Sequence, residues 1–127
     1  MRLNLIKSVY AHCDLPCGVY DPIQAKVEAE SLKAILEKYQ GLDEHGKIRA
    51  TVIKEERAEM VKHHLMVLWA DYFKEEHLVK YPDLHTKFWK AIKQASQVKQ
   101  HFDVKEANKL LEQIDEISKI FWETKNK

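Results

Sequence analysis

The stretch DVKEANKLLEQIDEISKIFWETK, from Asp103 to Lys125, decides the fold. Its apolar residues recur at intervals of three and four, which is the periodicity of one face of an α-helix. Asp103 and Glu106 are typical of a capping box, in which two side chains satisfy the first free N–H groups of a helix. The apolar face consists of Ala107, Leu110, Leu111, Ile114, Ile117 and Phe121. Other helices must bury such a face, so this segment predicts a helical bundle.

Three upstream stretches have the same helical character. Asp21-Pro22 is a strong helix start, and that helix is expected to end near Gln40. A second helix is expected from about Ala50 to about Lys74, and a third from Tyr81-Pro82-Asp83 onward. Four amphipathic helices with short connections predict an all-α protein with an antiparallel four-helix bundle.

The composition supports one compact helical domain and excludes several kinds of partner. The chain has 127 residues, of which 21 are basic and 20 acidic, and its formal net charge is +1. This balance gives no basic surface for nucleic acid or for an anionic membrane, and no apolar stretch is long enough to cross a bilayer. Glycine and proline number three each, which argues against a turn-rich β fold.

The second helix is apolar on two sides. One side, expected to face the core, carries Ile53, Met60, Val61, Val67 and Leu68, and the other carries Leu65, Met66, Trp69 and Phe73. A helix that is apolar on both sides is usually buried on both sides, so we predict a homo-oligomer. The alternative is a partly exposed face covered by the N-terminal segment or by the region around Trp122.

Two charged residues occupy apolar faces. Glu28 lies within the apolar face of the first helix, and Arg57 lies on the core-facing side of the second. Burial of either charge alone is costly, so we expect the two to be paired or to contact a functional site. The alternative is that both lie near the end of the bundle and extend to water.

The unusual residues of the chain gather in HCDLPCGVYDP, from His12 to Pro22. Two thiols and an imidazole within six residues can surround one soft or borderline metal ion, and Pro16 and Gly18 permit a tight turn around Cys17. The spacing alone is a weak signal, because structural zinc normally needs four ligands. A disulfide between Cys13 and Cys17 would close only a small loop and stabilise little.

The run HCDLPCGVYDP closely resembles the nickel-binding hook of nickel-containing superoxide dismutases. The resemblance continues through QAKVEAESLKA, RATVIKEERAE, KHHLMVLWADYFK and IFWETK, and so covers nearly the whole chain from His12 to Lys125. It implies a superoxide dismutase with a four-helix-bundle domain over residues 12–127, a hook over residues 12–20, and assembly as a homohexamer. It also implies that residues 1–11 form a pro-segment.

The resemblance assigns the metal ligands. His12 would supply its α-amino nitrogen and its imidazole, Cys13 its backbone nitrogen and thiolate, and Cys17 a second thiolate. These donors would hold one nickel ion per subunit, which would cycle between Ni(II) and Ni(III) and convert superoxide to O2 and hydrogen peroxide. Planar nitrogen and sulfur donor sets suit nickel or copper, whereas zinc prefers a tetrahedron.

The resemblance also assigns residues around the metal. Tyr20 would cover its open face, and Asp14 would support the turn of the hook, in which Pro16 is expected to be cis. Glu28 would orient the axial imidazole, with Arg57 as its cationic partner. Tyr72 would lie near Tyr20, although on its own it would be better explained as an ordinary core residue.

Proteolysis would act as a chemical switch. The resemblance implies that a processing protease cuts between Ala11 and His12. Until that bond is broken, the His12 nitrogen is an amide and cannot serve as an amine ligand. A chain that still carries residues 1–11 is therefore expected to bind nickel poorly and to lack activity. This segment resembles an export signal only superficially, because Asn4 and Lys7 interrupt its apolar run, so we expect a cytoplasmic protein.

Two other functions remain open at this stage. A thiol–disulfide protein would use Cys13 and Cys17 without nickel, although the chain lacks the C-x-x-C spacing of such proteins. A non-catalytic helical interaction protein would keep its assembly when nickel is removed and would not act on superoxide.

Overall fold

A computed structural model of the protein describes residues 17–126, and this part of the chain is helical without any strand. Its elements are α1 (Ile23–Tyr39), α2 (Glu44–Val67), a π-helical turn η1 (Leu68–Tyr72), α3 (Glu75–Lys80), α4 (Leu84–Gln100) and α5 (Val104–Lys125). None of these helices combines the length and apolar character that crossing a membrane requires.

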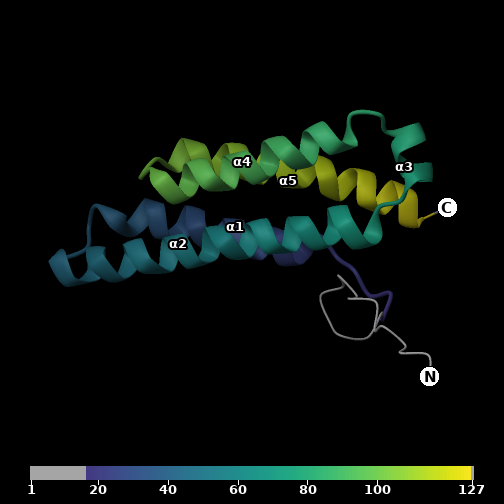
Figure 1. Cartoon of the computed structure of the whole chain (residues 1–127). Helices are drawn as coiled ribbons and strands as arrows, with labels where there is room; N and C mark the ends of the chain where they lie inside the picture. The colour runs from purple at the N-terminus through teal and green to yellow at the C-terminus, as the bar shows by residue number, and fades with distance from the viewer. Residues whose placement is uncertain (1–16, 127) are drawn as a thin grey trace, which may run out of the picture.

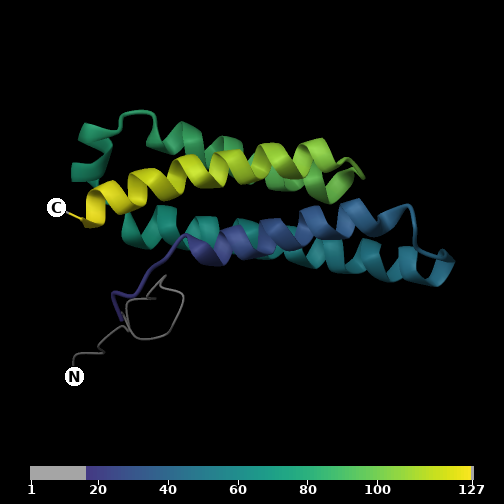
Figure 2. The ribbon, with the colours of Figure 1, turned by 180° about the vertical axis from the view of Figure 1, so that it is seen from behind.

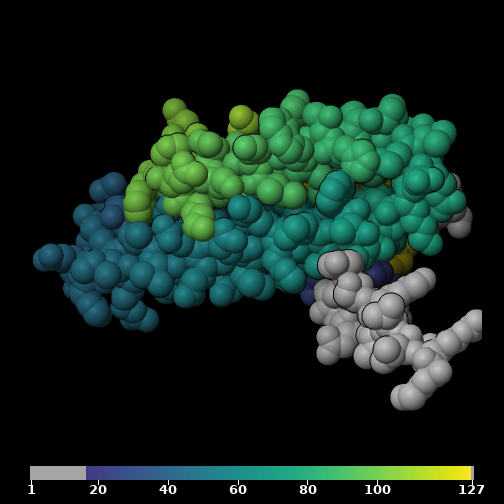
Figure 3. Space-filling view, viewed as in Figure 1, coloured from purple at the N-terminus to yellow at the C-terminus, as the bar shows by residue number. Residues whose placement is uncertain are grey.

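The four long helices form the expected antiparallel bundle. α1 packs against α2 and α5, and α4 packs against the same two helices, so each long helix has two neighbours. Figures 1 and 2 show α1 and α2 as one layer and α4 and α5 as the other. Side chains of α4 lie directly on those of α2 along the face seen in Figure 3. The start of α1, η1, α3 and the end of α5 meet at one end of the bundle, which we call the hook end (Figure 1).

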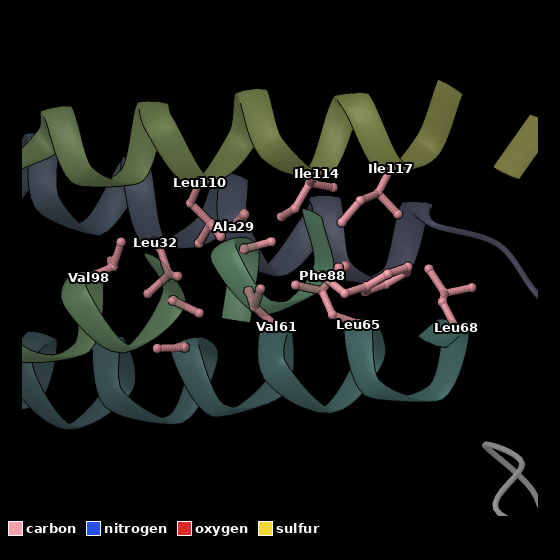
Figure 4. Packing of buried hydrophobic residues seen from close by; sticks show 14 of the residues in the cluster. Ala29, Leu32, Val61, Leu65, Leu68, Phe88, Val98, Leu110, Ile114 and Ile117 are labelled. Carbon is pink, nitrogen blue, oxygen red and sulfur yellow. The ribbon is translucent and has the colours of Figure 1, made fainter. Parts of the chain in front are cut away.

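The core runs the length of the bundle between the two layers (Figure 4). It is built from small and branched side chains together with Phe73, Phe88 and Phe121. The apolar face predicted for α5 is confirmed, except that Leu111 is only partly buried. Fully enclosed core residues include Ala29, Leu32, Val61, Leu65, Phe88, Val98, Leu110, Ile114 and Ile117.

The residues at the helix starts explain why the predicted start of α2 and one predicted capping interaction of α5 are wrong. α2 begins at Glu44, well before the expected Ala50, because the Asp43 carboxylate accepts the N–H of Gly46 at 2.7 Å and caps the helix. At α5, Asp103 accepts the N–H of Lys105 at 2.9 Å, so it caps the helix as predicted. The reciprocal half of the expected capping box is not formed, since the Glu106 carboxylate accepts a hydrogen bond from Gln94 of α4.

The two faces expected for the second helix are partly wrong. Leu65 and Phe73 were expected to face outward, yet they are 0% and 8% exposed, whereas Ile53 is exposed. Phe73 is buried because of the π-helical turn η1. Its N–H donates to the carbonyl of Leu68, five residues back, at 3.0 Å. This wider turn brings Phe73 onto the side of Leu68, which α-helical spacing could not achieve. Met66 and Trp69 remain exposed, at 50% and 41%.

The short helix α3 was not expected. It has six residues and none of them is buried, so it lacks an apolar periodicity that a sequence pattern could reveal. The ring nitrogen Nδ1 of His77 accepts the N–H of Lys74 at 3.0 Å and closes its first turn. α3 connects η1 to α4 at the hook end and places His77 beside Tyr72.

Candidate metal centre

The described chain reaches the bundle through a short segment without regular secondary structure that begins at Cys17. The Cys17 side chain is exposed, and its Sγ accepts the backbone N–H of Val19 at 3.4 Å. Asp21 then accepts the N–H of Ile23 at 2.9 Å, so α1 begins at the Asp21-Pro22 pair as expected. The thiol is therefore held a few residues ahead of a rigid helix, at the hook end.

Gly18 determines the backbone conformation of this segment. Its φ of +69° lies in the left-handed region, which side chains disfavour, and it is the residue with positive φ in the described chain. A Cβ at this position would meet nothing within 4 Å. The glycine is therefore required by the backbone conformation and not by lack of space.

Tyr20 and Tyr72 come together at the hook end. Their ring centroids lie 5.7 Å apart with the planes inclined by 56°, and both rings are partly buried against the core. The Tyr72 ring also packs on Phe121 at 4.3 Å and stacks nearly parallel to His77 at 5.8 Å. The ammonium of Lys125 lies 5.9 Å from the Tyr72 ring centroid. Three elements, η1, α3 and α5, thus hold Tyr72 against the segment that follows Cys17.

Glu28 and Arg57 form the pair that their positions predicted. Arg57 Nη1 lies 3.0 Å from one carboxylate oxygen of Glu28 and 3.2 Å from the other. The Glu28 side chain is 15% exposed and that of Arg57 36% exposed. The carboxylate is thus largely removed from water, and its charge is compensated by a guanidinium that still reaches the surface.

The structure brings the predicted residues together in two groups. The first joins Tyr20 to Tyr72 just behind Cys17, and the second joins Glu28 to Arg57 between α1 and α2. The other predicted site residues lie outside the described residues, namely Ala11, His12, Cys13, Asp14 and Pro16. Within residues 17–126, no three histidine, cysteine or carboxylate side chains are grouped so that they could hold a metal.

Thr124 is a contact of Tyr72 that the sequence interpretation missed. Its Oγ1 lies 2.8 Å from the Tyr72 hydroxyl oxygen, and the residue is 9% exposed. A signal for it was present, because Thr124 follows Ile117 and Phe121 at the spacing of the apolar face of α5. A polar side chain at such a position needs a buried partner.

Comparisons with known proteins point to one family. The family model described as nickel-containing superoxide dismutase matches residues 7–125. "Superoxide dismutase [Ni]" of Streptomyces seoulensis is 59% identical over 118 residues, which are 92% of this chain and 90% of that protein. The corresponding protein of Streptomyces coelicolor is 56% identical over 119 residues, 93% of this chain and 91% of its own length.

Solved structures agree with the sequence relatives. A native nickel superoxide dismutase structure at 1.30 Å superimposes with a TM-score of 0.89 and 56% identity, covering 91% of this chain and all of the other. A structure with nickel ligation corresponding to the oxidised state gives a TM-score of 0.88 at 58% identity with the same coverage. Fold and sequence thus lead to the same group of proteins.

Proposed function

Since this chain belongs to the nickel-containing superoxide dismutase family, we propose that it disproportionates superoxide at a nickel ion held by an N-terminal hook that proteolysis exposes. Nickel is its cofactor and superoxide its substrate, so the chain is an oxidoreductase. The observation that carries the placement of the site is the exposed Cys17 thiol directly ahead of the Tyr20–Tyr72 contact.

The donor chemistry fits nickel. Thiolates and nitrogen donors in a planar arrangement suit Ni(II), and the exposed Cys17 supplies one such thiolate at the surface, where a metal can reach it. In the proposal, His12 and Cys13 supply the remaining donors. When bound, nickel would supply the electron transfer, since alternation between Ni(II) and Ni(III) would oxidise one superoxide to O2 and reduce another, which takes up two protons from solvent, to hydrogen peroxide.

The protein groups around the hook control access and orientation. Tyr20 would restrict the approach to the metal, with Tyr72 supporting Tyr20 from the bundle, and Asp14 and Pro16 would maintain the turn. The Glu28 carboxylate would accept the imidazole N–H of His12 and so fix the direction of the ring, as partners of metal-binding histidines generally do. Arg57 holds that carboxylate in place, in line with its two contacts to Glu28.

Cleavage and assembly complete the proposal. Removal of residues 1–11 by a processing protease converts the amide nitrogen of His12 into an amine that can bind nickel. The exposed Met66 and Trp69 on α2 support a homo-oligomer, which we take to be the homohexamer implied by the family. We place the enzyme in the cytoplasm, where a nickel hook with two thiols would not be lost to structural disulfides.

A comparison of two chains tests the proposal. The chain that begins at His12 is expected to bind about one nickel per subunit and to dismutate superoxide, whereas the chain that begins at Met1 should do neither. Cys17→Ser in the shorter chain should abolish both properties. Equal nickel content and equal activity in the two chains would refute the role of proteolysis, and activity without nickel would instead favour thiol–disulfide chemistry.

A further inference from the structure

The hydrogen bonds of Thr124 determine where the hydroxyl proton of Tyr72 lies. The Thr124 hydroxyl donates to the carbonyl oxygen of Phe121 at 2.7 Å, one turn back in α5. The same oxygen lies 2.8 Å from the hydroxyl oxygen of Tyr72. A threonine hydroxyl has one proton and two lone pairs, so once its proton is donated to Phe121 it can only accept from Tyr72. With the Thr124 proton donated to Phe121, Tyr72 is the donor in this pair, a contact whose own geometry allows either direction.

The packing around Tyr72 fixes the position of its ring. Its ring lies between His77 on one side and Phe121 on another, with centroid distances of 5.8 and 4.3 Å. Thr124 is 9% exposed and sits in the last turn of α5, where its backbone is helical. The position of the ring is thus set by packing, and the direction of its proton is set by Thr124.

We propose that Thr124 is a positioning residue for the active site, which directs the Tyr72 hydroxyl proton into the bundle so that Tyr72 presents only an oxygen acceptor to the hook. This inference rests on the proposed function, because it takes the region beside Tyr20 to be the nickel site. Tyr72 then orders a donor on the hook side, such as the Tyr20 hydroxyl or a water molecule. It cannot itself donate a proton to superoxide without first breaking its bond to Thr124.

The π-helical turn η1 is the second part of this arrangement. Phe73 occupies the core position on the side of Leu68, through the bond from its N–H to the Leu68 carbonyl. Tyr72, the last residue of η1, is left partly buried between Tyr20 and α5. The extra residue in the turn therefore frees Tyr72 from the core and brings it within reach of Thr124.

The first experiment measures the hydrogen bond without nickel. Tyrosine labelled with ¹³C at Cζ gives separate signals for protonated and deuterated hydroxyls when exchange with solvent is slow, and Tyr72→Phe assigns the signal. In the full chain we expect hydroxyl exchange at Tyr72 to be about tenfold faster or more in Thr124→Val, because an alternative acceptor is then water. Thr124→Ser should keep the slow exchange. Equal exchange in the wild type and Thr124→Val would overturn the proposal.

The second experiment measures the consequence in the nickel-loaded chain that begins at His12. Thr124→Val is expected to lower kcat/KM for superoxide by about three- to tenfold, and Thr124→Ser to restore it. In a Tyr72→Phe background, Thr124→Val should have no further effect, since Thr124 acts through Tyr72. A loss of the same size in both backgrounds would show a merely structural role and contradict the proposal.

A matched control separates the hydroxyl from its helix. Thr51 of α2 also donates to a carbonyl one turn back, that of Lys47 at 2.8 Å, and lies away from the hook end. Thr51→Val should leave both measurements unchanged. If Thr124→Val does not fold, the smaller Thr124→Ala replaces it with the same expected outcomes. A wild-type chain that carries nickel but fails to dismutate would refute the proposed function, whereas the exchange measurement would still decide the Thr124–Tyr72 hydrogen bond.

Discussion

Arg57 Nη1 donates to both carboxylate oxygens of Glu28, at 3.0 and 3.2 Å, and this contact joins α2 to α1. The carboxylate is the more buried partner of the pair. A charge pair in this setting adds little net stability, because desolvation offsets its attraction. Its value lies in holding a carboxylate in one orientation.

Glu28→Gln is therefore expected to affect the metal site more than the fold. Loss of an outer partner of a metal-binding histidine typically lowers metal affinity or activity by about ten- to 100-fold. We expect a loss of this size in the nickel affinity of the chain that begins at His12, measured by competition with a chelator. Glu30→Gln, at an exposed position of the same helix, is the control. Equal affinities in the two variants would contradict the assigned role of Glu28.

Gly18→Ala should weaken nickel binding without destabilising the bundle. An alanine with positive φ costs about 1–2 kcal/mol, so nickel affinity should fall by about five- to 30-fold. Because a Cβ at Gly18 would touch nothing within 4 Å, the thermal midpoint should not change. Gly41→Ala, where the new Cβ would lie 3.7 Å from the Lys38 carbonyl oxygen, should affect neither quantity. A lower midpoint for Gly18→Ala would show that this glycine serves the fold.

Lys54→Met is expected to destabilise the fold although it removes a charge from the interior. The Lys54 side chain is 1% exposed, and its ammonium donates to the carbonyls of Val98, Lys99 and His101 at 2.9, 2.5 and 2.9 Å. These carbonyls end α4, and Lys54 also lies 4.3 Å from the ring centroid of Phe102. Methionine would fill the space but satisfy none of them, at a cost of about 1–3 kcal/mol.

Urea unfolding of Lys54→Met measures this cost. Lys33→Met is the control, because the Lys33 side chain on α1 is 39% exposed and its 3.9 Å contact with Glu37 is a surface pair. The control should change the free energy of unfolding by less than about 0.5 kcal/mol. Unfolding free energies for Lys54→Met equal to those of the wild type would show that water replaces the ammonium at the end of α4.

The loss of folding stability at acidic pH should depend on Glu59. The Lys99 ammonium, 2.8 Å from Glu59 Oε1, lowers the pKa of this carboxyl from its ordinary value of 4.5, and the charge of Lys62 adds to the effect. Such a group stabilises the fold above pH 4.5, and this contribution is lost as the pH falls through the lower folded-state pKa. Glu59→Gln should thus be less stable than the wild type at pH 7, and the difference should disappear in strong acid.

Urea midpoints between pH 2.5 and pH 7 provide the test, in steps of about half a pH unit across the titration of a carboxyl. The exposed Glu56 of the same helix offers a matched variant, Glu56→Gln, whose difference from the wild type should not vary in this way. A constant difference for Glu59→Gln at every pH would show that the Lys99 contact does not persist in solution.

Periodic apolar faces made most of the bundle predictable. α4 and α5 each present one such face to the core, and their burial follows it closely. α2 was harder, because its polar first turn depends on the cap from Asp43 to Gly46, and a glycine normally argues against a helix. Its far end was misassigned because a π-helical turn shifts the spacing, and α-helical periodicity cannot foresee that shift.

The candidate site was predictable in part. Charges at apolar positions foretold the contact between Glu28 and Arg57, since an unpaired buried charge is costly. The closeness of Tyr20 and Tyr72, which are far apart in the chain, came from the family resemblance and is found in the structure. Thr124 was overlooked because the sequence does not show which residue a single polar side chain in an apolar face contacts. The assignments for His12 and Cys13 stay predictions.

The hook end also holds the end of α5, and this has a practical consequence for anyone who labels the protein (Figure 1). An affinity tag or fluorescent reporter fused after α5 would begin beside Lys125 and Tyr72, at the mouth of the proposed site. Under the proposed cleavage between Ala11 and His12, a tag at the other terminus would be lost with residues 1–11. The turn between α1 and α2, around Gly41 and Leu42, lies at the opposite end of the bundle and is the better attachment point for such an insertion.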